Sequence, residues 1–186
     1  MVKDQEKENV MKFLSSMLNS EYEHQTLKYM AYHIPYIDIP SKYKNYMIST
    51  FIFYYQLDCL FEKGLIDENT KAKLNELYSY YLELDNKLSD YGIMDNDVYR
   101  KKEILEKRNL GDNKEELELL EKEHSEIENK MHIIFLKQEE ITKIFANYHL
   151  LEEINLGQLI ENSVSVDDVN YDLDSEIKKI NKHKTR

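Results

Sequence analysis

The sequence predicts an all-α fold, a helical bundle that carries a long antiparallel coiled-coil hairpin. Apolar residues alternate at three- and four-residue spacing from Leu74 to Leu105 and again from Leu117 to Tyr148, the pattern of a helix stripe packed against a partner helix. The two stripes mirror each other about Gly111, so core positions oppose core positions in an antiparallel pair. The chain also has only 4 Gly and 2 Pro, too few for the many turns of a β-protein.

The N-terminal part of the chain is predicted to contain two helices. Residues 4–33 have an apolar stripe of helical spacing, and Pro35 and Pro40 then enforce a non-helical connection. Ser41 is a suitable N-cap for the second helix, which is apolar on nearly every side and ends near Gly64. A helix of that kind usually lies in the centre of a bundle.

The two arms of the hairpin are expected at about 67–109 and 112–150. Asp67 or Asn69 can cap the first arm, because short polar side chains accept hydrogen bonds from the free N–H groups of a first helical turn. Gly111 suits the left-handed position just past the end of this arm. The arms are therefore joined by a short turn.

Two pairs of residues have the types that cap or end helices and therefore affect the predicted limits of the arms. Asp112 followed by Glu115 resembles a capping box that starts the second arm. Gly92 followed by Asp95 can end one helix and cap another. A kink or break at 92–95 is therefore an alternative to an unbroken first arm.

The chain is predicted to form one helical domain, residues 1–162, followed by a tail. Within this domain, residues 1–66 form an N-terminal helical body, residues 67–148 the hairpin and residues 149–162 a helical return. Residues 163–186 hold a run of acidic residues and then a run of basic residues, without an apolar period. That composition is typical of a charged, flexible tail.

The formal net charge of −11 is concentrated on the second arm. Residues 111–162 hold 13 acidic and 5 basic residues. A field of this sign repels nucleic acid and favours a basic partner surface, whereas the simpler interpretation is a solvated helix face. The candidate partner-binding residues are the outward glutamates of this arm: Glu115, Glu116, Glu118, Glu121, Glu123, Glu126 and Glu128.

No motif for catalysis or cofactor binding is visible, so we expect no enzymatic activity, no cofactor and no metal site. Two Glu-x-x-His pairs, Glu21 with His24 and Glu121 with His124, have the spacing found in di-iron sites of four-helix bundles. A chain so rich in glutamate supplies such pairs by chance. His124 is instead expected, together with Gln138, to fix the register of the seam.

One acidic segment has the spacing of the oxygen ligands in a calcium loop. Leu173 occupies the position that needs glycine and Lys179 the position that needs glutamate, so we expect no calcium site. The oxygen-bearing residues are Asp168, Asn170, Asp172 and Asp174.

The sequence favours a cytoplasmic protein that does not associate with membranes. Cys59 is the single cysteine, which excludes an intramolecular disulfide and fits a reducing compartment. Residues 1–9 carry charges of both signs, unlike the start of a signal peptide. The most apolar window, residues 47–61, is interrupted by Gln56 and Asp58 and is too short to span a bilayer.

Together these features predict a protein-protein interaction module, an acidic inhibitor or adaptor that occludes a basic surface of a partner. A nucleic-acid-processing enzyme is the expected kind of partner, and direct binding to nucleic acid is not expected. The alternative is a structural or assembly factor whose seams pair between chains to give a homodimer. A helix-turn-helix within residues 1–64 is the least favoured option, because that region lacks a cluster of Lys and Arg.

Overall fold

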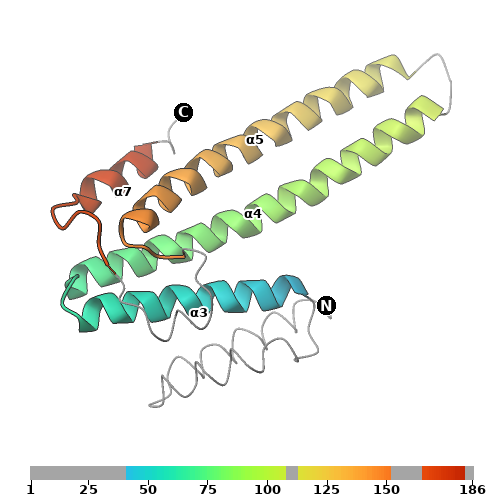
Figure 1. Cartoon of the computed structure of the whole chain (residues 1–186). Coiled ribbons are helices and arrows are strands. Elements are labelled where there is room, and N and C mark those ends of the chain that lie inside the picture. Colours follow the sequence, from blue (N-terminus) through green and yellow to red (C-terminus); the bar gives the residue numbers. More distant parts are fainter. Residues whose placement is uncertain (1–40, 108–112, 152–164, 183–186) are drawn as a thin grey trace. The chain divides into compact units, whose positions relative to one another are not determined.

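The described part of the chain contains α-helices and no strand, which confirms the all-α prediction (Figure 1). None of these helices is long and apolar enough to cross a membrane. The predicted first helix, residues 4–33, lies outside the described residues. The computed structural model describes residues 41–107, 113–151 and 165–182.

The chain divides into two compact units. The first unit holds helix α3 and the segment that follows α5, and the second holds α7 and most of the α4–α5 hairpin. The units are Met1–Glu68 with Phe145–Tyr171, and Asn69–Ile144 with Asp172–Arg186.

Helix α3, Ser41–Glu62, belongs to the first unit and occupies the position predicted for the second helix. It ends in a turn in which the Gly64 N–H donates to the Phe61 carbonyl at 2.9 Å. Gly64 has a φ of 68°, a left-handed value that glycine adopts without steric strain. Glycine therefore ends α3 at the predicted place.

Buried residues of α3 form the core of the first unit together with the end of α5. The ring centroid of Phe53 lies 5.2 Å from that of Phe145, and both side chains are fully buried. The buried amide of Gln56 accepts a hydrogen bond from the Leu151 N–H at 2.8 Å. These contacts hold the residues after α5 against α3.

Helix α4, Glu68–Lys107, is one unbroken helix of 40 residues. It continues through Gly92 and Asp95, so the alternative of a break at 92–95 is wrong. Leu84 and Val98 are both 2% exposed and lie before and after the glycine. We attribute the continuity to this packing, which outweighs the cost of about 1 kcal/mol for glycine inside a helix.

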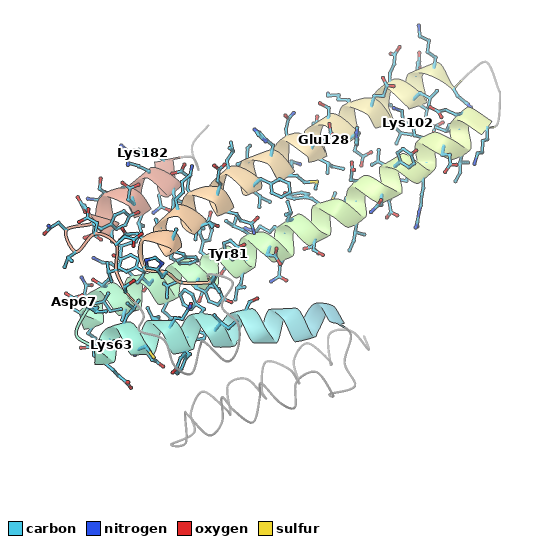
Figure 2. The ribbon with its side chains drawn as sticks, in the orientation of Figure 1. Lys63, Asp67, Tyr81, Lys102, Glu128 and Lys182 are labelled. Carbon is cyan, nitrogen blue, oxygen red and sulfur yellow. The ribbon has the colours of Figure 1, made fainter. Side chains whose placement is uncertain are left out.

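Helix α5, Lys114–Asn147, runs antiparallel to α4 and completes the predicted hairpin (Figures 1 and 2). The Lys102 Nζ on α4 lies 3.2 Å from a Glu121 carboxylate oxygen on α5. Gly111 and Asp112, predicted to form the turn, lie outside the described residues. A core cluster joins the two arms and consists of Val98, Leu120 and Ile127, with Tyr91, Leu105 and Met131 packed around it.

Helix α5 ends at Asn147 in a left-handed turn. The His149 N–H donates to the Ala146 carbonyl at 3.0 Å, and His149 has a φ of 50°. The helical return expected for residues 149–162 therefore does not run on directly from α5, and its residues from 152 onward lie outside the described ranges.

Helix α7, Leu173–Lys182, lies in the segment that was predicted to be a charged tail. Leu173 and Ile180 are buried on one side of it. The Asp172 carboxylate accepts the Ser175 N–H at 3.1 Å and so caps the first turn. The sequence pattern does not predict this helix, and the flexibility of residues 163–186 stays a prediction.

Candidate protein-binding surface on helix α5

The seven glutamates predicted to bind a partner are all exposed on the first half of α5. They face outward because Leu120 and Ile127, which share this stretch of helix, are buried against α4. We call this set the acidic face, and its role in partner binding stays a prediction. It consists of Glu115, Glu116, Glu118, Glu121, Glu123, Glu126 and Glu128.

Three members of the acidic face have cationic or imidazole neighbours. The contacts of Glu118 and Glu128 are long and lie within α5, and both carboxylates are about two-thirds exposed, so these pairs contribute little to stability. Glu121 reaches across to the other arm. The pairs are Glu118 with Lys114 at 3.9 Å, Glu121 with Lys102 at 3.2 Å and Glu128 with His124 at 3.5 Å.

The other four carboxylates, those of Glu115, Glu116, Glu123 and Glu126, form no ion pair with any residue of the described ranges. Lys122 lies among them in the sequence and is also exposed. The negative charge of these four groups is therefore balanced mainly by solvent. They are the part of the acidic face that can bind cations without breaking an ion pair with a described residue.

A polar pair crosses the seam below the acidic face. His124 Nδ1 lies 2.6 Å from a carboxylate oxygen of Asp95 on α4. Asp95 is thus not the helix cap that was considered in the sequence analysis, because it lies inside α4 and pairs with a residue 29 positions away. A polar contact within an apolar seam favours one alignment of the two arms.

The His124 site does not have the geometry of a metal centre. Asp95 lies at Nδ1 and Glu128 at Nε2, and these nitrogens point to opposite sides of the imidazole ring, so the two carboxylates cannot converge on one ion. Glu121 pairs with Lys102 instead. No group of three or more metal-ligating residues occurs within the described residues, and the Glu21–His24 pair lies outside them.

The oxygen ligands of the calcium-like segment are engaged separately. Asp168 accepts the Asn170 N–H at 2.9 Å, and Asp172 caps α7. The Asp174 carboxylate lies 2.6 Å from Lys73 Nζ on α4. This segment therefore has local structural roles, in keeping with its departures from the calcium-loop pattern.

The thiol of Cys59 on α3 has a raised pKa. Burial raises the pKa of its thiol, a hydrogen bond from Tyr55 opposes that shift, and the nearby carboxylate of Glu62 adds to it. A raised thiol pKa leaves less of the reactive thiolate near neutral pH. Burial also raises the pKa of Tyr55, to about 12.

Exposed apolar side chains on α5 are the feature that the sequence analysis missed. Leu119 is 67% exposed and lies within the acidic face, and Ile133, Phe135 and Leu136 are between 42% and 51% exposed further along the helix. The sequence contains a signal for this exposure, the four consecutive apolar residues from Ile133 to Leu136. A single helix seam can bury only part of such a run, so the rest is exposed.

Comparison of the chain with protein-family models, curated proteins and solved structures found no match. A helical hairpin by itself specifies no activity, because unrelated functions share simple folds. Any proposal about function therefore has to be argued from the exposed residues of α5.

Proposed function

We propose that this protein is a non-enzymatic interaction module that presents the acidic face of α5 to a basic surface of a partner protein. The observation that carries this proposal is the set of four exposed glutamates without an ion-pair partner among the described residues: Glu115, Glu116, Glu123 and Glu126. Such carboxylates gain charge-assisted hydrogen bonds when they meet Lys or Arg, and they lose no existing ion pair in doing so.

The spacing of the carboxylates supports a partner that normally binds nucleic acid. From Glu115 to Glu128 the helix rises about 20 Å, so the seven carboxylates of the acidic face occur about once every 3 Å. One strand of double-helical DNA carries one phosphate per about 3.4 Å of helix axis. The seven carboxylates are spread over the outward sides of α5, so the similarity is in charge per length of axis, and it lets the helix compete with nucleic acid for lysines and arginines.

The module acts, in this proposal, as an inhibitor or adaptor that occludes the nucleic-acid-binding surface of an enzyme in the cytoplasm. Repulsion between like charges disfavours direct binding of DNA or RNA to the same face. Because the contact is electrostatic and exposed, its affinity falls steeply as salt rises.

The test compares two variants with the same change in net charge. The first replaces Glu115, Glu116, Glu123 and Glu126 by Gln. The matched control neutralises four exposed acids on α4 by replacing Glu76 and Glu83 with Gln and Asp90 and Asp97 with Asn. Each protein is used as bait in a nuclease-treated lysate, and captured proteins are quantified by mass spectrometry at low and high salt.

We expect wild type and the α4 control to capture the same basic protein at low salt. The amount captured by the α5 variant should be at least tenfold lower. Capture should also disappear at high salt for all three baits. Equal loss in both variants would mean that net charge alone attracts the partner, and equal retention in both would reject the acidic face as a binding surface.

A further inference from the structure

One stripe of α5 combines the exposed apolar residues with acidic residues. Leu119, Glu126, Ile133 and Glu140 recur every seventh residue, so they lie along one side of the helix. Ile144 follows Ile133 by eleven residues, about three helical turns, and shares this side. The three aliphatic residues differ sharply in exposure, because Leu119 is 67%, Ile133 42% and Ile144 only 1% exposed.

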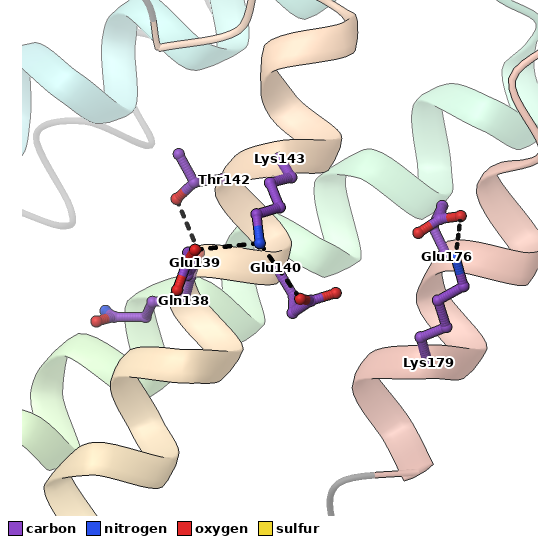
Figure 3. Close-up of polar contacts among 7 residues, drawn as sticks. All are labelled: Gln138, Glu139, Glu140, Thr142, Lys143, Glu176 and Lys179. Carbon is purple, nitrogen blue, oxygen red and sulfur yellow. Dashed lines mark hydrogen bonds and ion pairs between the residues drawn. The ribbon is translucent and has the colours of Figure 1, made fainter.

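Helix α7 lies beside the end of this stripe. Glu140 points from α5 toward α7 (Figure 3), and its charge contributes to the raised pKa of Lys179, which is due mainly to a hydrogen bond to Glu176. The ion pair of Asp174 with Lys73 holds the other end of α7 near the start of α4. The chain therefore already places an amphipathic helix beside the end of this stripe, where Glu140 pairs with Lys143 of α5 at 3.5 Å.

The composition of α7 indicates what kind of helix fits. Its apolar side includes the buried Leu173 and Ile180, and its second half carries Lys178, Lys179 and Lys182. A helix with aliphatic residues on one side and lysines beside them can pack on apolar residues while its ammonium groups approach carboxylates.

No helix of the described residues covers Leu119 or Ile133, which are 67% and 42% exposed. From Leu119 to Ile133 the stripe rises about 21 Å, the length of about four helical turns. The exposed Glu123 and Glu126 lie between its apolar ends, and neither forms an ion pair with a described residue.

We infer that the exposed part of this stripe, from Leu119 to Ile133, docks a basic amphipathic helix of the partner protein, with Leu119 and Ile133 as its apolar anchors. The inference rests on the proposed function and names the structural element that the acidic face recognises. The glutamates attract Lys or Arg on the incoming helix, and the anchors bind its aliphatic side. A second copy of this chain is a poorer occupant, because two proteins of net charge −11 repel each other.

The test uses two lysine-leucine peptides of about 18 residues, about 27 Å long as helices. In the first peptide the leucines lie on one side of the helix. In the second the same residues are rearranged so that leucines are spread around it. Binding of each fluorescent peptide to the full chain is measured by anisotropy, for wild type and for the L119Q/I133Q double variant.

The matched control is I93Q/I104Q, which replaces two exposed isoleucines of α4. Circular dichroism and the melting temperature check that both double variants fold. We expect L119Q/I133Q to bind the amphipathic peptide at least tenfold more weakly than wild type and to bind the rearranged peptide with unchanged affinity. The α4 control should bind both peptides as wild type does.

The outcomes separate this inference from the proposed function. The glutamine variant of the acidic face replaces Glu115, Glu116, Glu123 and Glu126. If it binds both peptides more weakly while L119Q/I133Q binds the amphipathic peptide as wild type does, the acidic face is supported as a binding surface. The role of Leu119 and Ile133 as apolar anchors is then rejected. If the glutamine replacements leave both peptides unaffected, the electrostatic proposal fails as well.

Discussion

Two glycines show how the same residue type has opposite effects at different backbone conformations. Gly92 lies inside α4, and a Cβ added there would meet nothing within 4 Å. Gly64 ends α3 with a φ of 68°, where a side chain is strained whatever the space around it. Replacement by alanine removes flexibility at the first position and introduces strain at the second.

We expect G92A to raise the free energy of unfolding by about 0.5–1 kcal/mol, and G64A to lower it by about 1–2 kcal/mol. Urea titrations followed by circular dichroism measure both changes. A destabilising G92A would indicate that the helix is bent or packed at Gly92 in a way that alanine cannot adopt.

Single residues were predictable from the sequence only where their role depends on helical spacing. The exposure of Glu115 and its neighbours follows from the buried stripe of α5, because positions off the stripe face solvent. The pairing of Asp95 with His124 did not follow, because capping is a local signal and the true partner lies on the other arm. The exposure of Leu119 was not predicted either, because an apolar residue outside the seam can be buried by another element or left in solvent, and spacing within α5 does not distinguish the two.

At the scale of the helices, the seam contact between Asp95 and His124 is a compromise between stability and alignment. Both side chains are about one-third exposed, so their polar contact is worth less than about 1 kcal/mol. Leucine at both positions would extend the apolar cluster around Val98. The apolar surface buried in this way would replace the polar contact as a source of stability.

We therefore expect D95L/H124L to raise the melting temperature by about 2–4 °C for each 1 kcal/mol gained. The control is D90L/S125L, which adds leucines at exposed positions of the same two helices and should bring no such gain. A lower melting temperature for D95L/H124L would show that the polar pair contributes more than packing does.

The helices themselves were predicted to different degrees. Helices α4 and α5 lie within a few residues of the predicted arms, because a long repeat of 3-4 spacing leaves little ambiguity. Helix α7 was missed because it is only ten residues long and its charges occur in blocks that are typical of tails. This helix buries Leu173 and Ile180, and their burial depends on tertiary contacts that a local sequence pattern does not show.

For the molecule as a whole, burial of the seam within one chain favours a monomer over the homodimer of the alternative hypothesis. Val98 and Ile127 are both 2% exposed without any second chain, and the net charge of −11 opposes self-association. We expect multi-angle light scattering at low micromolar concentration to give a mass near 22.4 kDa. Twice that mass would indicate that the arms pair between chains.

The antiparallel geometry of the hairpin also bears on how the chain can fold. The Asp95–His124 contact closes a segment of only 29 residues, whereas the hydrogen bond from Leu151 to Gln56 joins residues 95 apart. The entropy lost on closing a loop grows with the length of chain enclosed, and topologies rich in short-range contacts reach the native state fastest. The two arms can thus pair progressively from their joined ends toward their free ends. We expect the first unit, whose contacts join residues far apart in the sequence, to form last.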